Sequence, residues 1–181
     1  LGVAAATQNQ ALAALLFLYR EVLGLELGPL PEATRAHRTK RLPVVLSRSE
    51  ARNLLAELAG VERLAALLLY GGGLRLLEVL RLRVKDLDFE RHEIVVRSGK
   101  GDRDRRTMLP ATAAAELRPH LVAVERLHRA DLAAGLGRVD LPGALARKLP
   151  TAALEWPWQW VFPSAKFAED PRSGETRRHH F

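Results

Sequence analysis

The sequence contains no cysteine among its 181 residues, so a disulfide and a thiolate metal site are both excluded. None of the six histidines stands at helical spacing from a carboxylate as in a zinc protease motif, so we predict no metal site and no cofactor. The longest apolar stretches, residues 11–19 and 64–70, are far shorter than the roughly 20 residues that cross a membrane. We therefore expect a cytoplasmic protein with no membrane partner.

Methionine is nearly absent as well. Met108 is the one methionine, and the chain opens on Leu1. The first helical pattern also has no preceding partner for its apolar stripe. We therefore expect that N-terminal sequence is missing.

What the sequence has in excess is positive charge. It carries 28 Lys and Arg against 21 Asp and Glu, a formal net charge of +7. This balance favours a polyanionic partner such as nucleic acid over an acidic small molecule, although a basic but inert surface is the plain alternative. With 48% hydrophobic residues the chain can bury one fair core, or one domain and part of another.

The N-terminal third suggests a helix followed by a linker. Thr7 and Gln10 form a possible capping box, and leucines then recur at helical spacing as far as Gly24. Residues 28–43 break this pattern with Pro29, Pro31 and a basic run, which indicates a linker. We place the boundaries at residues 1–27, 28–45 and 46–181.

A second domain is predicted from Ser47 onward. Ser47 and Glu50 repeat the capping-box signal, and the helix that they open should stop at Gly60. An apolar segment then reaches the glycine triplet at residues 71–73, and residues 74–80 read as a short helix.

The period then changes to that of strands. Between residues 84 and 110 we predict a small antiparallel sheet of three strands with a tight hairpin at Lys100. Alanine-rich helical sequence follows to about residue 135, and Pro119 should restart or kink that helix. Residues 135–154 are poorly patterned, with a short helix possible at 141–148.

The order of motifs carries a family resemblance. An Arg-x-x-Glu pair alone, such as Arg75 and Glu78 in residues 73–80 (GLRLLEVL), is a weak signal. Here it precedes Asp86-Leu87-Asp88, then a Gly-Lys-Gly turn, then Leu109-Pro110. In this order the elements resemble the tyrosine recombinase (phage integrase) family.

The resemblance implies an α+β fold that is mostly α. Residues 1–27 would be part of an N-terminal helical DNA-binding domain, and residues 28–45 a basic linker. Residues 46–181 would be the first half of a tyrosine-recombinase catalytic domain with its small three-stranded antiparallel sheet.

The resemblance makes Arg75 a catalytic residue. Phosphodiester transfer passes through a pentacoordinate state with extra negative charge on the non-bridging oxygens. A guanidinium stays charged and donates a planar fork to two of these oxygens without a metal. Glu78, one helical turn later, is expected to hold Arg75 or a neighbour in place, and an ordinary surface ion pair is the alternative.

The predicted hairpin supplies a second catalytic candidate. The resemblance implies that Lys100 is the general acid that protonates the leaving 5′ oxygen, and the alternative is a solvated turn lysine. Four arginines nearby are expected to bind backbone phosphates or to face water: Arg97, Arg103, Arg105 and Arg106. Four linker cations would position DNA in a two-domain clamp, unless the linker is only solvated: Arg35, Arg38, Lys40 and Arg41.

The far end of the chain suggests a subgroup. Residues 135–160 resemble the extra helical insertion of integron integrases, as does the continuation through residues 161–180. The resemblance implies recognition of a folded single strand with extrahelical bases. Trp156, Trp158 and Trp160 could stack on bases, but at this spacing we favour a local core.

The resemblance also says what the chain lacks. The family's His-x-x-Arg motif, a later His or Trp and the tyrosine nucleophile are expected beyond Phe181. His179 and His180 precede that motif, and Tyr19 and Tyr70 lie in the wrong helices to be the nucleophile.

As a bacterial recombinase fragment the chain should bind duplex DNA and folded single-stranded recombination sites, and be inactive alone. The intact family works as a homotetramer on DNA, and integron integrases integrate and excise gene cassettes through a 3′-phosphotyrosine. Two alternatives stay open: a DNA-binding module without catalysis, and a helical interaction protein whose basic surface is incidental.

Overall fold

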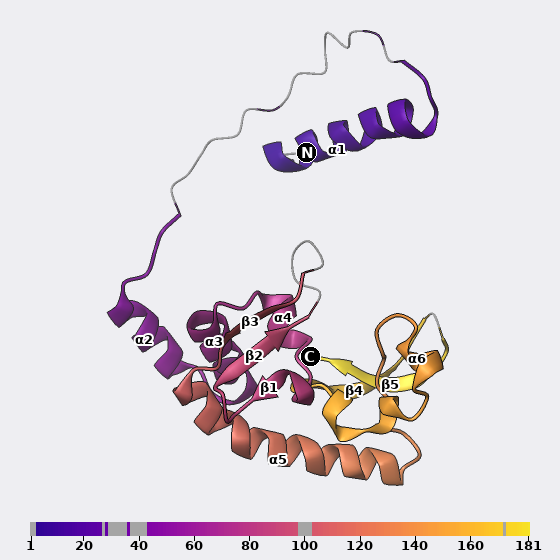
Figure 1. Ribbon diagram of the computed structural model, residues 1–181. Coiled ribbons are helices and arrows are strands. Elements are labelled where there is room, and N and C mark those ends of the chain that lie inside the picture. Colours follow the sequence, from indigo (N-terminus) through magenta and orange to yellow (C-terminus); the bar gives the residue numbers. More distant parts are fainter. Residues whose placement is uncertain (1–2, 27, 29–35, 37–42, 98–102, 172) are drawn as a thin grey trace. The chain divides into compact units, whose positions relative to one another are not determined.

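The computed structural model describes residues 3–26, 28, 36, 43–97, 103–171 and 173–181. It contains two compact units, Leu1–Val45 and Leu46–Phe181, and each is described by itself (Figure 1). Both helices and antiparallel strands occur, so the expected mixed and mostly helical class is confirmed.

The first unit contains helix α1 (Ala5–Phe17), which continues as a π-helical turn over Leu18–Val22. The helix was expected, but the capping box at Thr7 is wrong. Ala4 is the N-cap and makes no side-chain hydrogen bond. Alanine is the strongest helix former, so Ala5 and Ala6 extend the helix back past Thr7.

The second unit opens with α2 (Arg48–Glu57), and here the predicted capping box is confirmed. Glu50 N donates to Ser47 Oγ at 3.3 Å, and Ser47 N donates to Glu50 Oε2 at 2.8 Å. The helix ends before Gly60, and Gly60 instead begins α3 (Gly60–Gly72). Arg63 of α3 donates to the carbonyl of Leu55, which satisfies an acceptor in the last turn of α2.

A three-stranded antiparallel sheet follows, as predicted. Its strands are β1 (Leu87–Asp88), β2 (Glu93–Val96) and β3 (Arg105–Met108), in the order β1-β2-β3. Val96 pairs with Arg105 at the end of the β2–β3 ladder. The predicted hairpin at Lys100 lies outside the described residues.

Helix α5 (Ala111–Ala133) runs through Pro119 rather than restarting there. A proline deprives the carbonyl four residues earlier of its hydrogen bond, and that residue is Ala115. Ala115 and Pro119 are both exposed, so water can satisfy this carbonyl and the helix continues.

Two buried clusters hold the second unit together. The larger lies between α3, the sheet and α5, and its fully buried side chains include Leu68, Ile94, Leu117 and Phe162. The smaller cluster gathers Val139, Leu141, Ala152, Ala153 and Trp160, with Trp158 packed against it. Local core packing is therefore confirmed for Trp160.

The C-terminal part contains one short helix and a hairpin. Helix α6 (Leu145–Lys148) falls within the predicted short helix, and 3-10 turns follow at Ala152–Leu154 and Trp156–Trp158. Strands β4 (Pro163–Glu169) and β5 (Thr176–His180) form an antiparallel hairpin that was not predicted. Figure 1 shows this hairpin in orange to yellow, with the C-terminus pointing toward α4.

Candidate functional site

The second unit carries an open groove of about 1040 Å³. One wall comes from α4 (Leu76–Leu80), the 3-10 turn Val84–Asp86 and the end of β2. The other comes from residues 140–160 and the end of β5. The charged and aromatic side chains of the lining are Arg75, Glu78, Arg81, Arg83, Lys85, Asp86, Arg97, Asp104, Asp140, Trp158, Trp160, Asp170, His179 and His180.

Arg75 stands at the start of α4, where Glu78 holds it in place. Glu78 Oε2 accepts from the backbone N–H of Arg75 at 2.8 Å, and Oε1 accepts from Arg75 Nη1 at 2.8 Å. The Arg75 side chain remains 57% exposed, whereas that of Glu78 is only 10% exposed. A partly buried carboxylate thus fixes a cation that keeps access to the groove.

Glu78 binds a second arginine from β3. Arg105 donates from Nη1 to Oε1 at 2.8 Å and from Nη2 to Oε2 at 2.7 Å, the bidentate geometry of a strong pair. This hydrogen bonding by Arg105 is the largest cause that lowers the pKa of Glu78 to about 2, and Arg75 adds to it. Glu78 is therefore an anion at neutral pH that binds two cations, Arg75 and Arg105. Its supporting role at a reaction site stays a prediction.

Arg105 and Arg97 were both expected to bind phosphates or to face water, and both form ion pairs while 35% and 49% of their side chains stay exposed. Arg97 follows β2 directly and donates from Nε to the buried carboxylate of Asp86 at 2.9 Å. Arg106 pairs with Glu93 at 3.3 Å and is mostly exposed, and Arg103 is exposed. The phosphate-binding roles of these four arginines stay predictions.

The other predicted site residues lie outside the described part of the chain. They are Lys100 in the hairpin and the linker cations Arg35, Arg38, Lys40 and Arg41. Their assigned roles also stay predictions.

Arg83 binds the part of the groove lining formed by residues 140–160. The sequence did not single out this arginine. Its buried guanidinium donates to Trp158 O at 2.6 Å and to Asp140 O at 2.7 Å, and lies 3.9 Å from the ring centroid of Trp160. Burial lowers the pKa of Arg83, while the charges of Asp86 and Asp140 oppose that shift. Arg83 thereby ties the aromatic segment to the residues that follow α4.

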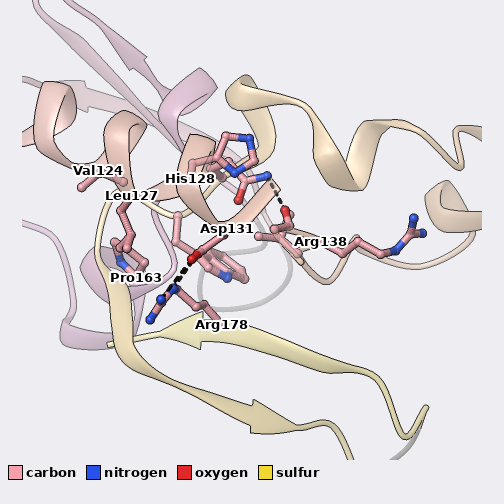
Figure 2. A pocket seen from close by; sticks show the side chains of 11 residues that line it. Val124, Leu127, His128, Asp131, Arg138, Pro163 and Arg178 are labelled. Carbon is pink, nitrogen blue, oxygen red and sulfur yellow. Dashed lines mark hydrogen bonds and ion pairs between the residues drawn. The ribbon is translucent and has the colours of Figure 1, made fainter. Parts of the chain in front are cut away.

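A second ion pair anchors the β4–β5 hairpin to α5. Arg178 donates from Nε to Asp131 Oδ2 at 2.6 Å and from Nη2 to Asp131 Oδ1 at 3.1 Å. Figure 2 shows these two side chains pointing toward one another beside a small cavity of about 20 Å³, with His128 close by. Burial lowers the pKa of His128, whose Nε2 lies 3.0 Å from Leu154 O. The pair fixes the strand that carries His179 and His180 into the groove.

This arrangement has the chemistry of a phosphate-binding surface. Cations on carboxylate supports can bind phosphate oxygens without adjusting their own positions. Among the described residues no group of three or more His, Cys, Asp or Glu side chains is placed to hold a metal ion. No helix in the described part of the chain is long and apolar enough to cross a membrane.

Comparison with known proteins agrees with this chemistry. The profile of the Phage integrase family matches residues 45–173. Two proteins named "Integrase/recombinase", from Escherichia coli and Pseudomonas aeruginosa, are each 49% identical over 178 residues, which is 98% of this chain and 53% of theirs. The tyrosine recombinase XerA of Thermococcus onnurineus is 47% identical over 75 residues, 40% of this chain and 27% of that protein.

A solved structure, the crystal structure of XerA recombinase, is 29% identical, with a TM-score of 0.42 over 67% of this chain and 43% of that one. The chain spans about half the length of the curated E. coli and P. aeruginosa relatives that it matches. The family profile covers most of the chain, and the relatives cover nearly all of it. The chain therefore belongs to the phage integrase family of tyrosine recombinases.

Proposed function

We propose that this chain supplies the DNA-binding and phosphate-activating part of a site-specific recombinase that cuts and rejoins DNA strands through a 3′-phosphotyrosine. The observation that carries the proposal is the Glu78 carboxylate, which binds both Arg75, a lining residue of the groove, and Arg105 of β3. Family membership supports the same reaction.

In the proposed reaction a tyrosine hydroxyl gives its proton to a base and its oxygen attacks the scissile phosphorus. The bond to the 5′ oxygen breaks, and a general acid donates a proton to that oxygen. Arg75 binds the non-bridging oxygens, on which negative charge grows in the transition state. Glu78 keeps the guanidinium in place because the carboxylate stays ionised. Lys100 is the proposed general acid, and neither Tyr19 nor Tyr70 is proposed as the nucleophile.

We further propose that the substrates are the recombination sites of gene cassettes, as in integron integrases. Support comes from residues 139–160, which form a cluster of their own and place Trp158 in the groove wall. A folded single strand would bind there as well as a duplex, and the active form would be a homotetramer on DNA. Residues 1–27 and 28–45 are proposed as part of the DNA-binding domain and as the linker.

A chimera tests this proposal. The matching half of the E. coli relative is replaced by this chain, and the chimera is incubated with nicked suicide substrates that carry a cassette site, either folded from one strand or as a duplex. We expect a covalent protein–DNA adduct with the folded strand, and the unaltered relative serves as the positive control.

Four outcomes distinguish the hypotheses. An adduct with the folded strand supports the integron assignment, and an adduct with duplex alone supports a recombinase of another subgroup. Binding of DNA without any adduct, while the parent relative reacts, would favour a DNA-binding module without catalysis. Failure to bind DNA would favour an interaction protein.

A further inference from the structure

A second buried carboxylate in the groove gathers two cations, as Glu78 does. Asp86 is 4% exposed. Its Oδ1 accepts from Arg97 Nε at 2.9 Å and lies 3.6 Å from Lys85 Nζ, while Oδ2 accepts from the backbone N–H of Arg83 at 3.1 Å. In the sequence, Asp86 stands out only as part of the Asp86-Leu87-Asp88 motif, and nothing there predicts a role for Lys85.

Lys85 is held from two sides. Besides Asp86, its ammonium lies 4.1 Å from the ring centroid of Trp158, a distance at which a cation–π contact contributes. Its side chain is 20% exposed and lines the groove. Burial lowers the pKa of Lys85 although Asp86 raises it, so the ammonium has lost part of its hydration. An anion arriving from the groove would replace that lost hydration.

Arg97 is the second cation that Asp86 binds. Its Nε faces Asp86, its Nη1 lies 3.8 Å from Asp104 Oδ2, and its side chain is 49% exposed. Arg97 directly follows β2 and Asp104 directly precedes β3, so the two residues lie at the same end of the β2–β3 pair. Arg97 therefore has one edge fixed on a buried support and an exposed portion in the groove.

The carboxylates that hold cations in the groove are less exposed than those cations. The groove lining contains carboxylates as well as cations. Asp86 is buried and the side chain of Glu78 is only 10% exposed, against 57% for Arg75 and 49% for Arg97. Such carboxylates organise the cations rather than meet the ligand. Asp86 holds Lys85 and Arg97 at 3.6 Å and 2.9 Å, whereas the second carboxylate at Arg97, that of Asp104, is 60% exposed and 3.8 Å away. A phosphodiester can therefore compete with Asp104 for the exposed part of Arg97 while Asp86 keeps both cations in place.

We propose that Lys85 and Arg97, organised by Asp86, form a phosphate-binding site for the DNA backbone, separate from the phosphate bound at Arg75. The site rests on the proposed function, because it requires that the groove bind DNA. It positions the backbone and reads no sequence.

Removal of the Asp86 charge gives the sharpest test. Asp86→Asn raises the net charge of the chain by one, so overall electrostatics alone predict tighter binding to DNA. The proposal predicts weaker binding, because the amide no longer holds Lys85 and Arg97 by charge. Asparagine retains an oxygen that can accept from the N–H of Arg83, so the local turn is preserved.

The experiment measures binding of the full 181-residue chain to a labelled duplex by fluorescence anisotropy over a range of salt concentrations. The variants are Lys85→Gln, Arg97→Gln and Asp86→Asn. Arg129→Gln is the matched control, because Arg129 also pairs with a carboxylate, at 2.7 Å from Glu125, but does not line the groove. Tryptophan fluorescence verifies the fold of each variant.

We expect Lys85→Gln and Arg97→Gln each to reduce the slope of log affinity against log salt by about 0.9, the value for one phosphate contact on duplex DNA. Arg129→Gln should bind like the wild type, and Asp86→Asn should bind more weakly. Tighter binding by folded Asp86→Asn would overturn the inference. If Asp86→Asn does not fold, slopes for the other two variants equal to that of Arg129→Gln would overturn it just as well.

The same measurement separates this inference from the proposed function. A wild-type chain that does not bind the duplex contradicts both. A wild-type chain that binds with a steep salt dependence, while Lys85→Gln and Arg97→Gln match the control, contradicts the second phosphate site alone.

Discussion

Replacement of Glu78 by glutamine should weaken the fold in a manner that depends on pH. The folded protein lowers the pKa of Glu78 from 4.5 to about 2, mainly because Arg105 donates to its carboxylate. At about 1.36 kcal/mol per pKa unit, the ionised form gains at most about 3 kcal/mol on folding. The arginine side chains are 57% and 35% exposed, so screening by water reduces this to about 1 to 2 kcal/mol.

The sign of the pH dependence follows from the direction of the shift. Because the pKa is lower in the folded state, the stabilisation is complete above pH 4.5 and is lost as the pH falls toward about 2. Glu78→Gln should therefore lower the free energy of unfolding at neutral pH by about 1 to 2 kcal/mol. The difference from wild type should shrink below pH 4.5.

Urea unfolding followed by tryptophan fluorescence measures this directly. All three tryptophans lie in the second unit, so the signal reports that unit alone. Glu125→Gln is the matched control, because Glu125 also pairs with an arginine, Arg129, but that arginine is 74% exposed. A difference between Glu78→Gln and wild type that stays constant from neutral pH to pH 3 would refute the reasoning, as would no difference at all.

Three further predictions concern the same unit. Asp131→Asn leaves Arg178 with an unpaired charge in a site where both side chains are at most 14% exposed, so urea unfolding should show a loss of about 2 to 4 kcal/mol. Phe162→Ala removes a fully buried ring and should cost about 3 to 5 kcal/mol in the same assay; a loss below that of an exposed control such as Val122→Ala would contradict the core assignment. Burial lowers the pKa of His128, so the wild type should lose stability as the pH falls below 6.5, and His128→Gln should lose less over that interval.

Features built from neighbouring residues could be predicted from the sequence. The capping box at Ser47 and the strands of the small sheet depend on local hydrogen bonds and on alternation over a few residues, and both are present. The hairpin of β4 and β5 was missed because its strands contain few β-branched residues. A turn signal was available in Asp170-Pro171 and Ser173-Gly174, between the two strands.

The site itself depends on pairs far apart in sequence. Glu78 was expected to hold Arg75 or a neighbour, but its bidentate partner Arg105 lies 27 residues away, at the start of β3. Arg178 and Asp131 are 47 residues apart, and Arg97 meets Asp86 only because β1 and β2 run antiparallel. Charged side chains alone do not specify such partners, because any of several carboxylates could pair with each arginine until the strands fix their register.

The proposed role of Arg75 is to stabilise the charge that grows on the scissile phosphate. Its most direct test is the rate of covalent adduct formation under single-turnover conditions, in the chimera of this chain with the E. coli relative. Arg75→Gln should slow that step about a hundredfold or more, and Arg75→Lys should restore little because it lacks the planar fork, while Arg129→Gln should react like the parent chimera. Adduct formation by Arg75→Gln at the rate of the parent chimera would contradict the account.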